Sequence, residues 1–471
     1  MFMKSIYKLF ILIFCLSLEI LAQYGSVGSF DARSMGMAKT YTATSRGINS
    51  IGINPANLMY NDDGHFEFST LLPLPTISLR SGSDFLSIED FNYYFGGVDG
   101  EARYLNDQDK ERLSNLFKNG GDVFLNASTR IFSASFKVND EIGAFGISVS
   151  DFMGANLKVP QSLIDIPLYG NTLEHVYSFS ESNIKSWWLR DYSLSYAREI
   201  PTKNIVKKLF AGITLKYING FYYVGTDRMN TTLGTNSNYE ITGKADLVGY
   251  SSFSQNFGVK YDFDSTEYQS SFSPFPSPAG TGFGLDLGFS ASLSPVLNVS
   301  FAVTDLGSIK WSERAAQYSA LGDIYVDDIS NKEQMDSLGD KITGKGAYIN
   351  DFTSTLPTAL RFGASYFINK GIIPGTLLVG LDYNQGLNNM PGNSTKARVS
   401  VGSEWKPMDW IPYIRMGFSF GGWAGFNWAI GLGIDAGLME LNFATSDMNS
   451  LVAPNAAKHL SLSFGSRWKF N

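Results

Sequence analysis

Strict alternation of apolar residues with small or polar residues, sustained over long segments, is the feature that most constrains this chain. From Thr281 to Ser294 the residues Phe, Leu and Ala alternate with Gly, Asp and Ser, and similar alternation occurs from Leu297 to Thr304 and from Phe426 to Asp435. Because successive side chains of a strand point to opposite faces, each segment predicts a β-strand with one apolar face. The repetition along the chain predicts an all-β fold.

The composition indicates which environment suits such strands. The chain has 471 residues, 14% of them aromatic and only 17% charged, with 47 glycines, whereas a soluble protein has about 25% charged residues. After the N-terminus, no stretch reaches the roughly 18 apolar residues of a membrane-spanning helix. Dispersed hydrophobicity of this kind is typical of a transmembrane antiparallel β-barrel. The formal charge of -7, without a basic patch, argues against nucleic acid as a partner.

The first 22 residues have the pattern of a secretory signal peptide. Lys4 and Lys8 precede an apolar stretch from Leu9 to Ala22, after which we expect cleavage. Cys15, the only cysteine, lies within this segment. The mature chain would then contain no disulfide, thiolate metal site or cysteine nucleophile.

The face opposite the apolar one is mostly Gly, Ser and Asn, with few charges. A soluble sandwich would carry many more Lys and Glu on a face that meets bulk water. Sparse charges suit a barrel lumen of limited volume, where we expect opposite charges to pair across the interior. The charged residues on this face include Asp286, Arg361, Asp382, Arg398, Glu404 and Glu440.

Counting alternating segments predicts about fourteen transmembrane strands. Tyr239 to Tyr250 could form a further hairpin and make sixteen. Short connections alternate with long ones, as in bacterial outer-membrane barrels with short periplasmic turns and long extracellular loops. We therefore expect the bacterial outer membrane as the location, with its lipids and lipopolysaccharide around the barrel. The predicted strands are 65–80, 123–138, 142–155, 183–199, 209–226, 281–294, 297–311, 357–368, 375–386, 396–406, 411–421, 424–434, 437–445 and 458–470.

Residues 23–63 lack strand alternation and contain three short motifs. These are Asp31-Ala-Arg-Ser-Met-Gly-Met-Ala38, Tyr41-Thr-Ala-Thr44 and Gly52-Ile-Asn-Pro-Ala-Asn-Leu58. Followed by an aromatic-rich barrel, they resemble the FadL-like family of outer-membrane transporters for long-chain fatty acids and other hydrophobic compounds, in particular its branch common in Bacteroidetes. The resemblance implies that residues 23–63 fold as a hatch inside a barrel of residues 64–471. It places the hatch motif on Gly52, Asn54, Pro55, Ala56 and Asn57.

Simple physical reasoning also favours a plug. A barrel of fourteen strands is too wide for its wall side chains to fill, so an unplugged one would leak. Pro55 removes a backbone donor, while Gly47 and Gly52 permit positive φ. Such a segment is stable inside a barrel only if its polar backbone groups find partners on the lumen wall. An unstructured periplasmic tail is the alternative.

One loop segment predicts a helix. Asn106 precedes residues 107–119 as an N-cap, acidic residues occupy the first turn and Gly120 follows. Leu113, Leu116 and Phe117 share one face of this helix.

Signals for enzymatic activity are weak, and we expect no catalytic residue, no metal and no cofactor. Gly417-Phe-Ser-Phe-Gly421 matches a hydrolase nucleophile motif, but it lies within strand alternation and no helix follows it. The three histidines, His65, His175 and His459, have no metal-ligand spacing.

The last strand carries an alternating apolar pattern on Phe464, Trp468 and Phe470, which is typical of the signal read by the barrel-assembly machinery. The resulting functional hypothesis is porin-like transport of a hydrophobic, fatty-acid-like ligand through a plugged barrel. Two alternatives stay open: a noncatalytic barrel subunit of a secretion or surface-assembly complex, and an outer-membrane lipase for which His459 is the candidate base.

Overall fold

The computed structural model describes residues 31–470 apart from a few short segments. The predicted signal peptide 1–22 and the first residues of the predicted hatch lie outside the described part. The segments left out are 61–64, 98–100, 102, 203–205, 256–258, 263–264, 269–272, 274, 369–372 and 423–424.

The described strands form a closed antiparallel barrel of fourteen wall strands, which confirms the predicted fold class. Each wall strand pairs with its neighbours along the chain, and the last strand, β23, closes the barrel by pairing with β1 and β2. The wall strands are β1 (Phe66–Thr70) with β2 (Thr76–Ser83), β3 (Gly121–Asn139), β4 (Gly143–Val159), β6 (Asn183–Ile200), β7 (Lys208–Met229), β12 (Gly280–Ser292), β13 (Leu297–Trp311), β17 (Ala359–Ile368), β18 (Thr376–Gly386), β19 (Arg398–Lys406), β20 (Tyr413–Gly421), β21 (Phe426–Asp435), β22 (Met439–Thr445) and β23 (His459–Phe470).

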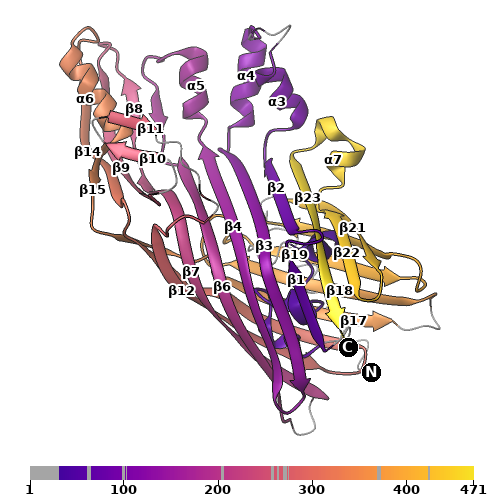
Figure 1. Cartoon of the computed structure of the whole chain (residues 1–471). Coiled ribbons are helices and arrows are strands. Elements are labelled where there is room, and N and C mark those ends of the chain that lie inside the picture. The colour runs from indigo at the N-terminus through magenta and orange to yellow at the C-terminus, as the bar shows by residue number, and fades with distance from the viewer. Residues whose placement is uncertain are drawn as a thin grey trace.

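The hairpin that would have raised the count to sixteen does not enter the wall. Most residues of this segment lie in β9 (Ile241–Phe253). This strand pairs with the C-terminal end of β7 and with β14 (Ala316–Val326). These strands extend the wall beyond the barrel on one side (Figure 1). The other strands outside the barrel wall are β5 (Val176–Ser178), β8 (Thr232–Thr235), β10 (Val259–Asp262), β11 (Ser265–Tyr268), β15 (Lys345–Tyr348) and β16 (Phe352–Thr355).

Long connections gather at one end of the barrel and short turns at the other, as predicted. The long-loop end carries the helices α3 (Ile88–Phe95), α4 (Asp107–Leu116), α5 (Ser162–Tyr169), α6 (Lys332–Thr343) and α7 (Asn449–Val452), and the turn η3 (Pro454–Ala456) follows α7 (Figure 1). The predicted loop helix is α4: Asn106 accepts a hydrogen bond from the Asp109 amide. Leu113 and Phe117 are buried in a cluster with Tyr94.

The alternation places apolar side chains on the outside of the barrel. On β12, Phe283 is 73% exposed and Phe289 46%, whereas Asp286 and Ser290 face inward and are buried. An outer surface of exposed Phe, Leu and Ile is suited to lipid rather than water. No helix among the described residues is both long and apolar enough to cross a membrane.

The first wall strand is interrupted, which corrects the predicted continuous strand 65–80. Residues 71–75 form a bulge opposite the single residue Ile131 of β3, because Thr70 pairs with Phe132 and Thr76 with Arg130. Pro73 and Pro75 have no amide hydrogen to donate to a ladder, which explains the interruption.

Candidate functional site

Residues 31–60 lie inside the barrel and are almost entirely buried, which fits a plug (Figure 1). Three short helical elements organise them: α2 (Ala32–Gly36), η1 (Gly47–Ser50) and η2 (Pro55–Met59). The helix α2 packs on β20 to β23, and η2 packs on β6, β7 and β12. The plug therefore spans the lumen and contacts opposite sides of the wall.

The hatch motif ties η2 to the wall and to the rest of the plug. Asn54 caps η2, since its Oδ1 accepts from the Ala56 amide at 3.1 Å, and its Nδ2 donates to the Phe289 carbonyl of β12 at 3.2 Å. Asn57 Nδ2 donates to the Thr42 carbonyl and to Ser45 Oγ, both at 2.9 Å. The buried amides thus satisfy the Thr42 carbonyl inside the plug and link η2 to the wall strand β12.

Gly52, Pro55 and Ala56 complete the motif. Pro55 occupies the first turn of η2, where its missing amide hydrogen costs nothing. Gly52 has φ of +80°, a conformation that glycine adopts without strain. Ala56 is fully buried in an apolar cluster with Ile48 and Leu58.

Glycines on the inner wall make room for the plug. A Cβ at Gly402 would lie 2.5 Å from the Met37 carbonyl oxygen, and one at Gly288 would lie 2.8 Å from Pro55 Cδ. Gly417 also faces the backbone of Met37. The first glycine of the Gly-Phe-Ser-Phe-Gly segment is therefore explained by contact with the plug.

A chain of buried ion pairs holds α2 against the opposite side of the wall. Arg33 Nε and Nη2 donate to the two Glu404 carboxylate oxygens at 2.8 and 2.7 Å. Arg415 also donates to Glu404, at 2.6 Å, and contacts Glu440 at 3.2 Å. Arg467 continues the chain to Glu440, at 2.6 Å.

The same chain reaches η1 through Glu67 of β1. Arg467 Nη1 lies 3.0 Å from one Glu67 oxygen, and the other oxygen accepts from the Ile48 amide of the plug at 2.8 Å. Sequence reasoning predicted pairing for Glu404 and Glu440 but missed the plug residue Arg33 and Glu67. Irregular segments such as the plug carry no periodic signal that would indicate which side chains face the wall.

The remaining predicted lumen charges behave differently from one another. Asp286 pairs with Lys216 at 2.9 Å. Asp382 binds the plug, since its Oδ2 accepts from the Tyr41 and Thr42 amides at 2.7 Å each. Arg361 and Arg398 are buried, but among the described residues they donate hydrogen bonds only to neutral oxygens. The expectation of paired charges is therefore wrong for these two arginines.

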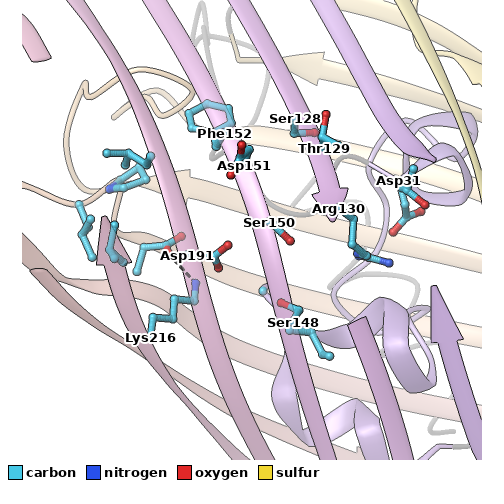
Figure 2. A pocket seen from close by; sticks show the side chains of 18 residues that line it. Asp31, Ser128, Thr129, Arg130, Ser148, Ser150, Asp151, Phe152, Asp191 and Lys216 are labelled. Carbon is cyan, nitrogen blue, oxygen red and sulfur yellow. Dashed lines mark hydrogen bonds and ion pairs between the residues drawn. The ribbon is translucent and has the colours of Figure 1, made fainter. Parts of the chain in front are cut away.

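A cavity of about 160 Å³ lies between the plug and the tall side of the wall (Figure 2). Its floor includes Ile51 and Gly52 of the plug. The apolar part of its lining comes from Phe152, Leu189, Ile218, Leu356 and Pro357.

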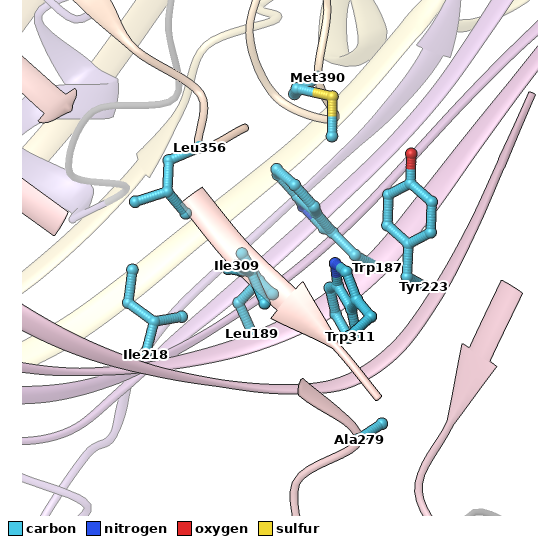
Figure 3. Close-up of a cluster of buried hydrophobic side chains, with 9 residues drawn as sticks. All are labelled: Trp187, Leu189, Ile218, Tyr223, Ala279, Ile309, Trp311, Leu356 and Met390. Atoms are coloured by element: carbon cyan, nitrogen blue, oxygen red, sulfur yellow. The ribbon is translucent and has the colours of Figure 1, made fainter. Parts of the chain in front are cut away.

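The cavity is continuous with a larger cluster of inward-facing apolar side chains (Figure 3). Leu189, Ile218 and Leu356 belong to both. Most of the other members come from strands that are far apart in sequence, and Met390 comes from the connection between β18 and β19. These other members of the cluster are Trp187, Tyr223, Ala279, Ile309, Trp311 and Met390.

Charged side chains form the other side of the cavity. Lys216 lies between two carboxylates, at 2.9 Å from Asp286 and 2.6 Å from Asp305. Arg190 pairs with Asp151 at 2.6 Å, and Asp191 also lines the space (Figure 2). The cavity thus joins an apolar surface to a surface in which carboxylates outnumber cations.

A second cavity, of about 650 Å³, lies on the short-turn side of the plug. Its lining contains Arg33, Arg46 and Tyr60 of the plug, together with Lys207 and Lys406 from the turn end of the wall. The Arg46 guanidinium lies 4.5 Å from the Tyr60 ring centroid and donates to plug carbonyls. The plug therefore separates two cavities of different character.

The residues considered for catalysis are not brought together. Ser419 is buried in β20, opposite Ser400 and Asn427. His459 begins β23, which is not a neighbour of β20, and its Nδ1 lies 3.9 Å from Asp447. Among the described residues, no group of three His, Cys, Asp or Glu side chains could hold a metal ion.

The C-terminal strand presents its alternating apolar residues outward. Trp468 stacks on Phe68 of β1, and Phe470 contacts Phe66 and Phe68. Phe464 lies opposite Ile77 of β2. These residues form the outer surface at the seam where the barrel closes.

A closed barrel with an apolar outer surface and a lumen crossed by a buried segment defines a plugged transmembrane β-barrel. The chain belongs to the family described as "Family of unknown function (DUF5723)", which matches residues 59–446. No match is found among the curated proteins.

Solved structures that resemble the chain include two toluene transporters. TodX of Pseudomonas putida has 10% identity and a TM-score of 0.45, with 95% of this chain and 99% of that chain covered. TbuX of Ralstonia pickettii has 12% identity and a TM-score of 0.46, with coverage of 94% and 99%. The translocator domain of the Neisseria meningitidis autotransporter NalP has 8% identity and a TM-score of 0.32, with coverage of 87% and 90%. Similarity at this level describes only how the backbone is folded.

Proposed function

We propose that this protein is a bacterial outer-membrane barrel that passes hydrophobic small molecules, of the fatty-acid or alkyl-aromatic kind, past its plug. The observation that carries the proposal is the inward-facing apolar cluster of Figure 3, which adjoins the cavity above the plug. The lumen of a barrel that conducts only water and ions is polar. An apolar surface leading to a space inside the lumen favours an apolar solute.

The size of the cavity supports the same class of solute. A protein cavity of about 150 Å³ lined by apolar side chains takes up benzene, and the space above the plug has about 160 Å³. One aromatic ring or a short alkyl segment would fit there without movement of the wall. A longer solute would have to displace members of the apolar cluster, which are buried at rest.

The plug gives the barrel its selectivity in this proposal. Residues 23–63 act as the hatch and residues 64–471 as the barrel, so water and ions are held back while a bound solute passes. The buried contacts of Asn54 and Arg33 with the wall support a plug that is fixed at rest.

Two variants test the proposal with uptake of labelled toluene and labelled decanoate into cells, beside single-channel conductance. Deletion of residues 23–61 should leave a folded barrel that conducts ions and has lost selective uptake. Ile218→Asn should lower uptake several-fold without opening an ion path, because it places an amide in the apolar wall of the cavity. Tyr239→Asn, at an exposed loop position, is the matched control.

Unchanged uptake in the Ile218 variant, or no uptake by the parent protein, would exclude the transport proposal. Heat-modifiable migration of each variant shows whether the barrel has folded. A deletion variant that is folded but does not conduct would show that other elements seal the lumen.

The second candidate, a barrel subunit of a secretion or surface-assembly complex, is favoured by an apolar patch at the long-loop end. Phe91 and Phe95 of α3 are 54% and 55% exposed, and Leu451 and Val452 of α7 are 66% and 65% exposed. The start of α3 is bonded to the end of η3, since the Ile88 amide donates to the Ala457 carbonyl at 2.9 Å. Copurification in mild detergent of a partner that is lost with Phe91→Ser and Phe95→Ser would favour this function.

We also propose that Phe464, Trp468 and Phe470 form the strand recognised by the barrel-assembly machinery. Replacing Trp468 and Phe470 together by Ser should lower the amount of inserted barrel severely, because both the recognition strand and its aromatic contacts at the seam are lost. A normal amount of heat-modifiable barrel in that variant would contradict the assignment.

A further inference from the structure

Two buried arginines on the short side of the wall differ from four ion-paired arginines of the lumen. Arg33, Arg190, Arg415 and Arg467 each contact a carboxylate within 3.0 Å. Arg361 and Arg398, which are 3% and 6% exposed, form no ion pair among the described residues. A buried cation that is not directly paired is more costly than a paired one.

The donors of these two arginines are incompletely used. Arg361 Nε donates to Thr304 Oγ1 at 3.3 Å, and its Nη2 is buried without a hydrogen-bond partner. Arg398 Nη2 donates to the Lys39 carbonyl of the plug at 3.4 Å, and its Nε is buried without a partner. Each guanidinium therefore keeps a buried N–H group for a further acceptor.

The sheet register brings the two side chains to the same level of the lumen. Arg361 of β17 lies opposite Asn384 of β18, and Asn384 lies opposite Arg398 of β19. Neighbouring strands are about 4.8 Å apart, so the two arginine backbones are separated by about 10 Å. Two guanidinium groups at this separation can converge on one small acceptor between them.

The plug brings a third basic residue to this place. Lys39 follows α2 with φ of +60°, and its carbonyl accepts from Arg398. Burial, together with the positive charges of Arg398, Arg80 and Arg361, holds the pKa of Lys39 well below its usual value. Arg80 itself is paired with Asp447 at 3.3 Å.

Carboxylates near the cluster are committed to other groups. Asp382 lies two residues before Asn384 on β18, and its Oδ2 accepts hydrogen bonds from two plug amides. Asp286 and Asp305 are paired with Lys216. Asp382 attracts both arginines electrostatically but, within the described part of the chain, forms an ion pair with neither.

We infer that Arg361 and Arg398 form a binding site for an oxyanion at the junction of wall and plug, beside Lys39. The ligand class is a carboxylate, sulfate or phosphate group, because such groups accept several charge-assisted hydrogen bonds from guanidinium donors. A free inorganic oxyanion and the carboxylate head of an amphiphile share this chemistry. The site is independent of the proposed transport, except that transport would supply the second of these sources.

Binding is tested on the full-length barrel in non-ionic detergent at constant ionic strength, with sodium sulfate, sodium decanoate and decanol as the probes. Calorimetry measures affinity and intrinsic tryptophan fluorescence measures the thermal midpoint. We expect sulfate, decanoate or both to bind and to raise the midpoint, and decanol to bind more weakly than decanoate. Response to sulfate indicates a free oxyanion as the source, and response to decanoate alone indicates an amphiphile.

Arg398→Met and Arg361→Met should each weaken anion binding by about ten-fold or more, the range expected for a lost charge-assisted hydrogen bond. Without added anion, these variants should be close to the parent in stability, because the cation removed forms no direct ion pair. Lys469→Met, which removes a paired cation near the turn end of β23, is the matched control and should bind anions normally. Arg398→Lys keeps the charge and should retain a weakened response if the methionine variant does not fold.

Absence of any response of the parent to sulfate and decanoate would overturn the inference and assign the spare donors to water alone. Equal binding of decanoate and decanol, with no effect of either arginine variant, would also overturn it. Uptake of uncharged toluene is measured on the same variants. Toluene uptake that persists without anion binding rejects this site alone, whereas anion binding without toluene uptake rejects the transport proposal alone.

Discussion

The two ends of the plug are attached to the wall by different physics. At α2, Arg33 enters a chain of buried ion pairs with Glu404, Arg415, Glu440 and Arg467 of the wall. At η2, no ion pair with the wall is found among the described residues. Amide hydrogen bonds, one hydrogen bond from the Lys137 ammonium to the Met59 carbonyl and close contact with wall glycines hold that end.

This difference indicates how each end responds to disturbance. Buried ion pairs add little net stability over an apolar contact, but removing one partner leaves an uncompensated charge and costs several kcal/mol. Neutral hydrogen bonds and packing contacts are lost in smaller steps. The α2 end should therefore remain attached until a charge is removed, whereas the η2 end should loosen gradually.

Plug opening can be measured directly because Cys15 is the only cysteine. In a Cys15→Ser background, Ala43→Cys places a thiol at a fully buried position of the plug. The rate of maleimide labelling then reports how often the plug opens. Single-channel conductance in a planar bilayer provides an independent measure.

The largest effect is expected from Glu404→Gln. Arg33 loses its carboxylate and Arg415 keeps only Glu440, so closure of the plug should weaken by about 3–5 kcal/mol. Maleimide labelling should accelerate by about a hundred-fold or more. Glu111→Gln, on the exposed face of α4, is the control. Labelling at the parental rate would mean that the ion-pair chain does not hold the plug.

The next effect tests the close-packed end. Gly288→Ala places a Cβ in collision with Asn54 Oδ1 and 2.8 Å from Pro55 Cδ, and overpacking of this kind costs about 1–3 kcal/mol. We expect faster labelling and brief conducting events. Gly339→Ala is the matched control, because a Cβ there meets no atom within 4 Å. An effect as large as that of Glu404→Gln would remove the proposed difference between the two ends.

These differences also show what the sequence could predict. The period-two alternation on strands such as β12 predicted the wall because one face meets lipid and the other meets the lumen. The interruption at residues 71–75 was missed, although Pro73 and Pro75 were visible. The partners of Arg33 were not predictable, since a segment without regular structure gives no register that relates it to Glu404.

Charge pairing in the lumen was predictable only in part. Glu404 and Glu440 are paired as expected, because an acidic side chain on an inner wall has few alternatives to a cation. Arg361 and Arg398 are not, and their position depends on the register of β17, β18 and β19. Alternation identifies the face of each residue but does not fix which residues of neighbouring strands lie side by side.

A smaller effect is expected from Asn57→Ala at the η2 end. The substitution removes the hydrogen bonds to the Thr42 carbonyl and Ser45 Oγ and the one that Asn57 Oδ1 accepts from Ser290 Oγ of the wall, and each neutral bond contributes about 0.5–1.5 kcal/mol. Labelling at Ala43→Cys should rise by several-fold. Asn455→Ala, in the outer turn η3, is the control. No change in labelling would show that Asn57 orders η2 without contributing to closure.

The smallest effect is expected from Pro55→Ala, and it separates preorganisation from contact. Proline in the first turn of η2 restricts the released plug, so its loss should weaken closure by about 0.4–1 kcal/mol while the hydrogen bonds of Asn54 and Asn57 persist. Labelling should rise by about two- to five-fold. Pro454→Ala provides a matched control, because Pro454 occupies the same position in η3 outside the lumen. If Pro55→Ala opened the plug as strongly as Gly288→Ala, the η2 end would depend on its backbone conformation rather than on its fit to the wall.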